Sequence, residues 1–82
     1  MGLDEPKTHL SELKQTFGAT LRRRRIKCGL SQREMAIRHG FSQNGLSAVE
    51  NGKSNISLSM MVRLAAAVDC EVPELLTKED AT

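Results

Sequence analysis

Residues 30–52 read LSQREMAIRHGFSQNGLSAVENG, and two short helices are predicted in them. Ser31 stands three residues before Glu34, which is the spacing of a capping box. In this arrangement the serine hydroxyl accepts the backbone N–H of the glutamate, and the glutamate carboxylate accepts the backbone N–H of the serine. We therefore expect one helix at residues 32–39 and, after a turn, a second helix at residues 43–51.

The two predicted helices are separated by Gly40, Phe41 and Ser42. Glycine readily adopts the left-handed conformation that ends a helix, and serine is a favoured cap for the helix that follows. A turn of about three residues that contains glycine is typical of the helix-turn-helix motif. We place this motif at residues 32–51 and expect its second helix to lie in the major groove of double-stranded DNA.

The second helix has one apolar and one polar face. Leu46 and Val49 are expected to hold it on the domain, while the opposite face is polar and uncharged. Glutamine and asparagine can bond adenine through two atoms, serine can donate or accept, and alanine can contact the thymine methyl group. Gly45 is small enough to permit a close approach. The predicted base-reading residues are Gln43, Asn44, Ser47 and Ala48.

Positive charge is concentrated in the middle of the chain. The net charge is +2, but residues 13–63 carry ten Lys or Arg against only Glu34 and Glu50. This distribution favours a localised anionic partner such as DNA, although a solvated basic face would look the same. Side chains near the motif are expected to bind phosphates without reading sequence. These anchoring residues are Arg23, Arg24, Ser42, Lys53, Ser54 and Asn55.

The remaining residues predict an all-α fold of five helices, since no stretch alternates polar and apolar residues. The first helix is expected from about residue 9 to Cys28, ending at Gly29. The fourth is expected at about residues 58–68 behind a Ser57 cap. One face of the first helix is expected to carry Leu10, Leu13, Phe17 and Leu21, and a short fifth helix has Pro73 in its first turn and ends near Leu76.

The chain has 82 residues, which sets one small domain as the upper limit. We place a compact DNA-binding domain at residues 13–76, preceded at 1–12 by an N-terminal arm or the start of the first helix, and followed at 77–82 by a flexible tail. A core of this size leaves about 3–5 kcal/mol of net stability, so a stabilising staple or a partner subunit is expected.

Several classes of function are disfavoured by composition. With no Trp or Tyr and only two Phe, a surface built on stacked aromatics is not expected. Cys28 and Cys70 lack metal or redox spacing and are expected to stay reduced. Neither a catalytic spacing nor a metal cluster, cofactor loop, signal peptide or membrane span is recognisable. We therefore expect a cytoplasmic protein that is not an enzyme and has no metal or cofactor.

The motifs together resemble a known family, the phage repressor and Cro type (Xre-like) helix-turn-helix regulators. The resemblance covers about residues 17–76, and its spacing is specific. The matching segments are Leu21-Arg22…Arg25, Gly29-Leu30-Ser31-Gln32, Met35-Ala36, Gly40-Phe41-Ser42, Val49-Glu50-Asn51-Gly52-Lys53 and Leu64-Ala65…Leu75-Leu76. The resemblance implies five helices, sequence-specific binding of DNA as a homodimer and regulation of transcription. It also implies that Gln32 contacts the phosphate backbone and the start of the second motif helix, and that Arg25 and Glu50 form a buried ion pair.

The segment Asn55-Ile56-Ser57-Leu58 also resembles that of restriction–modification controller proteins, which are small dimers of this family. The second motif helix departs from their pattern, because controllers often have an aromatic residue where this chain has Gly45 or Leu46.

A homodimer is expected because the two C-terminal helices remain free when the motif binds DNA. It would place the two motif helices about 34 Å apart on a near-palindromic operator. The alternative is a helical protein-interaction module or antitoxin-like partner whose basic face binds an acidic protein. The candidate dimer interface consists of Met60, Val72, Leu75 and Leu76.

Overall fold

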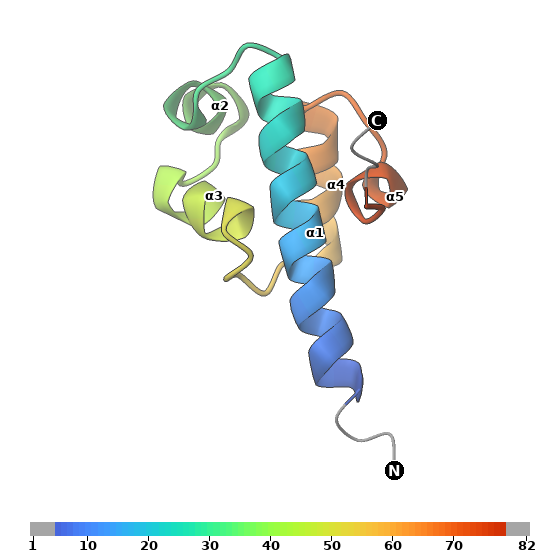
Figure 1. Ribbon diagram of the computed structural model, residues 1–82. Helices are drawn as coiled ribbons and strands as arrows, with labels where there is room; N and C mark the ends of the chain where they lie inside the picture. Colours follow the sequence, from blue (N-terminus) through green and yellow to red (C-terminus); the bar gives the residue numbers. More distant parts are fainter. Residues whose placement is uncertain (1–4, 79–82) are drawn as a thin grey trace.

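The computed structural model describes residues 5–78, and these residues form helices and no strand (Figure 1). The prediction of an all-α fold with five helices is confirmed. The first helix begins earlier than expected, so residues 5–12 belong to it; the rest of the predicted arm, and positions 79–82 of the predicted tail, lie outside the described residues. The helices are α1 (Glu5–Lys27), α2 (Gln32–His39), α3 (Gln43–Glu50), α4 (Leu58–Ala67) and α5 (Val72–Leu75).

Serine caps begin the three middle helices, as the sequence predicts. The Ser31 Oγ accepts the Glu34 N–H at 3.0 Å, and the Glu34 carboxylate accepts the Ser31 N–H at 2.9 Å. These bonds with Ser31 hold the pKa of the Glu34 carboxyl below its ordinary value. Ser42 caps α3 through the Gly45 N–H, and Ser57 caps α4 through the Met60 N–H, each at 3.1 Å. Each helix therefore starts at a position fixed by its own local sequence.

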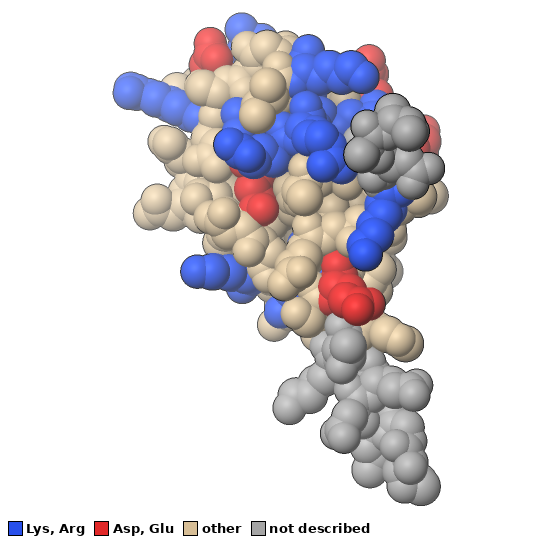
Figure 2. Space-filling view, in the orientation of Figure 1, with Lys and Arg blue, Asp and Glu red and all other residues tan. Residues whose placement is uncertain are grey.

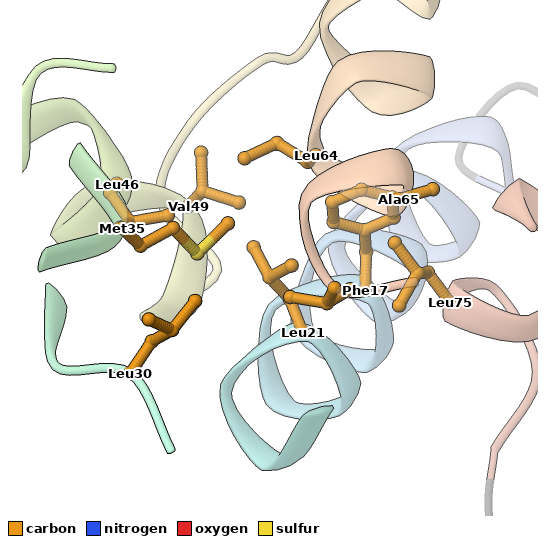
Figure 3. Close-up of a cluster of buried hydrophobic side chains, with 10 residues drawn as sticks. Phe17, Leu21, Leu30, Met35, Leu46, Val49, Leu64, Ala65 and Leu75 are labelled. Carbon is orange, nitrogen blue, oxygen red and sulfur yellow. The ribbon is translucent and has the colours of Figure 1, made fainter. Parts of the chain in front are cut away.

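The core lies around α1, which has α2 and α3 on one side and α4 and α5 on the other (Figure 1). Phe17 and Leu21 of α1 lie between the side chains of these two pairs (Figure 3). Leu10 and Leu13, which we expected on the same face of α1 as Phe17 and Leu21, are 49% and 46% exposed. Their side chains line an open groove beside α4 and α5 and do not enter the core, and the N-terminal end of α1 extends beyond the other helices (Figure 1).

Gly18 allows α1 to lie directly against the end of α3. A Cβ atom added to Gly18 would lie 2.2 Å from the Val49 carbonyl oxygen and 2.8 Å from that of Glu50. Real Cβ atoms essentially never approach another atom so closely. The missing side chain of Gly18 therefore sets how near α3 stands to the rest of the domain.

Candidate nucleic-acid interface

Helix α3 presents the residues that were predicted to read bases. Leu46 and Val49 are buried and hold the helix on the core. Gln43 and Asn44 are exposed, and Ser47 and Ala48 are half-exposed. The predicted base-reading residues therefore lie on the part of α3 that faces away from the core.

A buried network of three side chains joins α1, α2 and α3. Arg25 Nε and Nη2 donate to the two Glu50 carboxylate oxygens at 2.6 and 3.0 Å, and Arg25 Nη1 donates to the Leu30 carbonyl at 2.7 Å. The Gln32 side-chain amide also donates to Glu50, at 3.0 Å. The side chains of Arg25 and Glu50 are only 9% and 2% exposed. The network ties both ends of the motif to α1, and it engages the amide of Gln32, which was predicted to contact phosphate.

The predicted anchoring residues do not all lie beside the motif. Arg24 Nη2 pairs with the Glu74 carboxylate at 3.0 Å, which places Arg24 against α5. The pKa of Glu74 is lowered, first by the hydrogen bond from the Glu71 backbone N–H and then by Arg24. Arg23 Nη2 donates to the Thr20 hydroxyl at 3.5 Å along α1.

The segment after α3 contains the remaining anchoring residues. Lys53 and Asn55 are exposed and Ser54 is half-exposed, and the Lys53 backbone N–H donates to the Ala48 carbonyl at 2.9 Å. Ser42 is exposed at the start of α3. Figure 2 shows Lys and Arg side chains gathered over the C-terminal half of α1 as well. Polar groups thus lie at both ends of α3, and the cation Lys53 follows its C-terminal end.

Arg63 was missed in the sequence, although it holds the turn of the motif. Its guanidinium carbon lies 4.8 Å from the centre of the Phe41 ring. Its Nη2 donates to the His39 and Gly40 carbonyls at 3.3 and 3.5 Å. The signal available in the sequence was weak: Arg63 is the single cation among the residues of α4. The contacts join α4 to the turn between α2 and α3.

A cleft of about 290 Å³ opens between α3 and the segment that leads into α4. We call it the α3 cleft. Apolar side chains including Phe41, Ile56 and Met60 line it together with Gly45. Its polar lining residues are Ser42, Ser54, Asn55 and Ser57.

The structure corrects the predicted dimer interface. Leu75 is fully buried, because the single turn of α5 directs it into the core beside Phe17 (Figure 3). The prediction that Leu75 belongs to an interface is therefore wrong. Met60 lines the α3 cleft, whereas Val72 and Leu76 line a second groove of about 230 Å³. The cleft and the groove share the lining residues Ser54, Asn55 and Ile56. The four predicted residues do not form one patch.

That second groove is strongly apolar. We call it the α1–α5 groove, because it lies between α1 and α5; residues 54–56 and the start of α4 complete its walls. Leu58, at its rim, is 77% exposed. Its exposed or half-buried apolar residues are Leu10, Leu13, Leu58, Met61, Val72 and Leu76.

Cys28 is exposed, Cys70 is half-buried, and both thiols are free. Burial raises the pKa of the Cys70 thiol. Among residues 5–78 no three His, Cys, Asp or Glu side chains come together as a metal site. Along the same residues no helix has the length and apolar character needed to cross a bilayer.

Comparisons with known proteins agree with this geometry. The family model described as a helix-turn-helix domain matches residues 16–77. An uncharacterized HTH-type transcriptional regulator, y4dJ of Sinorhizobium fredii, is 35% identical over 71 residues, which are 87% of this chain and 92% of that protein. The control protein C.SmaI of Serratia marcescens is 31% identical over 83% of this chain and 81% of its own length.

Among solved structures, the restriction-modification controller protein C.AhdI from Aeromonas hydrophila is similar. Its TM-score is 0.70 at 39% identity, over 76% of this chain and 94% of that chain.

Proposed function

The chain belongs to the helix-turn-helix domain family of DNA-binding transcription regulators, and from this we propose that it binds a near-palindromic operator as a homodimer. The observation that supports this most directly is the chemistry of α3. Its exposed residues Gln43 and Asn44 are amides able to make paired bonds to adenine, and its buried residues hold it firmly on the core.

The charges of the residues indicate which of them recognise bases and which bind phosphates. No residue of α3 that faces away from the core is a cation, so affinity must come mainly from groups outside α3. Lys53 and the polar side chains of Ser54 and Asn55 follow α3 directly, and Ser42 precedes it. These groups are suited to phosphate contacts, which fix the register of α3 without reading sequence.

Replacing Gln43 or Asn44 with alanine is expected to weaken the recognition of bases and to leave the contacts with phosphates unchanged. Each substitution should weaken binding to the operator by about 1–3 kcal/mol and relax preference at one base position, because the bidentate contact is lost. Binding to unrelated DNA should hardly change, since neither side chain is charged. Operator selection from genomic fragments, followed by gel-shift titration against unrelated DNA, measures both quantities.

The matched control is Lys53→Ala, which should weaken binding to DNA of every sequence by the same factor. It should also reduce the slope of log affinity against log salt by about one unit, because one phosphate contact is removed. If both Gln43→Ala and Asn44→Ala keep the full operator preference, α3 does not read the bases. If no fragment outcompetes bulk DNA, the proposed operator binding fails as a whole.

We further propose that the α1–α5 groove is the dimer interface. Leu10, Leu13 and Leu58 are exposed or half-exposed there and adjoin Val72 and Leu76 of α5. A contiguous apolar patch on a small domain is a common mark of a protein interface. The two-fold arrangement would bring two α3 helices to successive major grooves about 34 Å apart.

Leu13→Lys is expected to weaken the dimer at least tenfold, which is about 1.4 kcal/mol, because it places a charge in an apolar interface. Ile26→Lys is the matched control, since Ile26 lies on the same helix, is 54% exposed and does not line the groove. Sedimentation equilibrium measures both dissociation constants. Equal weakening by the two variants, or a wild-type protein that stays monomeric far above its DNA-binding midpoint, would contradict the proposal.

Two of the similar proteins are named control or controller proteins, and we propose that this chain regulates a restriction–modification operon in the cytoplasm. The test is the set of genes next to its own. An adjacent endonuclease and methyltransferase would support the proposal, and phage lysogeny genes would contradict it.

A further inference from the structure

Gly45 is a glycine that the fold does not require. It lies in the first turn of α3 and does not have a positive φ angle. A Cβ atom added there would lie 3.5 Å from Ser42 Cβ and 3.6 Å from Ser42 Oγ, which are ordinary contacts. Glycine destabilises a helix relative to alanine, because it loses more conformational freedom on folding. The chain therefore carries an unfavourable residue at a position where alanine would fit.

The other helical glycine shows the contrast. At Gly18 an added Cβ atom would collide with the Val49 and Glu50 carbonyl oxygens, so the packing of α1 on α3 explains that glycine. Gly45 has no such neighbour and is exposed. The packing of the domain therefore does not explain why residue 45 is a glycine. A molecule that binds at α3 is the remaining explanation.

The α3 cleft lies directly beside Gly45. The residues that line it include no acidic side chain, and they combine apolar side chains with hydroxyl and amide groups. Ser42 Oγ accepts the Gly45 N–H at 3.1 Å, which leaves the Ser42 O–H hydrogen for another acceptor. Asn55 adds an amide at the same cleft, and the cation Lys53 lies two residues before it.

This combination fits one strand of a DNA duplex. The sugar of a nucleotide has an apolar face that matches the apolar lining residues Phe41 and Ile56. The phosphate oxygens are acceptors that match the hydroxyl and amide donors and the neighbouring positive charge. A free acidic side chain at the cleft would repel the strand, and none lines it.

We propose that the α3 cleft seats the sugar–phosphate strand of the operator, and that Gly45 keeps the cleft open and so sets how deeply α3 enters the major groove. This inference rests on the operator binding proposed above. It makes Gly45 a specificity-determining residue that acts through its lack of a side chain. A larger residue at this position would hold the strand away and lift the exposed amides of α3 from the base edges.

The test compares Gly45→Ala and Gly45→Leu with Ala66→Leu, which makes a similar change at an exposed site on α4 that does not line the cleft. Gly45→Ala is expected to raise the urea midpoint, because alanine favours the helix, and yet to weaken operator binding several-fold. Gly45→Leu is expected to weaken it at least tenfold and to lower the salt slope by about one unit. Ala66→Leu should leave operator binding unchanged.

Because Gly45→Ala is expected to gain stability, a loss of binding in that variant cannot come from unfolding. Operator affinity within twofold of the wild type for both Gly45 variants would overturn the inference. Weaker binding with an unchanged salt slope would also overturn it, since no phosphate contact would then be lost at the cleft. A wild-type protein that prefers no DNA fragment would instead refute the proposed function.

Discussion

Replacing Gly18 with alanine is expected to lower the free energy of unfolding by about 2–3 kcal/mol or more, because it overpacks a tight contact. The new methyl group would lie 2.2 Å from the Val49 carbonyl oxygen, and that oxygen is part of the backbone. It cannot turn aside as the end of a flexible side chain would. It also accepts the Gly52 N–H at 3.0 Å, so moving it disturbs the end of α3.

The expected loss is most of the stability of such a domain, which is about 3–5 kcal/mol in total. Urea unfolding followed by helical circular dichroism measures it. Gly45→Ala is the matched control, because the same substitution in another helix meets only ordinary contacts and should stabilise. Gly18→Ala with wild-type stability would mean that α1 and α3 are not in direct backbone contact.

Truncating Arg25 to alanine is expected to cost about 3–5 kcal/mol, because it leaves a buried charge without its main partner. The Glu50 side chain is 2% exposed, and Gln32 would be its remaining hydrogen-bond donor. The Leu30 carbonyl would also lose the Arg25 donor that lies 2.7 Å away. The variant should be largely unfolded under conditions in which the wild type is folded.

The double variant Arg25→Met, Glu50→Leu is expected to recover most of the loss, because apolar residues of similar volume need no charged partner. Urea unfolding of the wild type, the two single variants and the double variant gives the coupling energy between the residues. An additive result, in which the double variant is the least stable of the four, would show that the pair does not act as a unit.

Local signals in the sequence were sufficient to predict where the three middle helices begin. Ser31, Ser42 and Ser57 cap the helices that they were predicted to cap, because a cap depends on residues three positions apart. The helix-turn-helix motif and its assignment to transcription regulation were likewise predicted and are confirmed.

Contacts between distant segments were harder to predict. The role of Leu75 was misjudged because the sequence does not say how one turn of α5 is rotated about its axis. Arg24 was assigned to DNA because it belongs to an arginine run, yet neighbouring residues of a helix point in different directions and Arg24 meets Glu74. Arg63 gave only a weak signal, since its partners are backbone carbonyls and a ring that lie more than 20 positions away.

The length of α1 has a consequence for hydrogen exchange. Phe17 and Leu21 of this helix are buried in the core, while Leu10 and Leu13 line the open α1–α5 groove. Amide hydrogens at residues 10–15 should therefore exchange with deuterium faster than those at residues 18–25, because opening there breaks few tertiary contacts. If a second copy covers the α1–α5 groove, the protection of these amide hydrogens from exchange should rise with protein concentration. The exchange rate at residues 10–15 would then report on dimer formation.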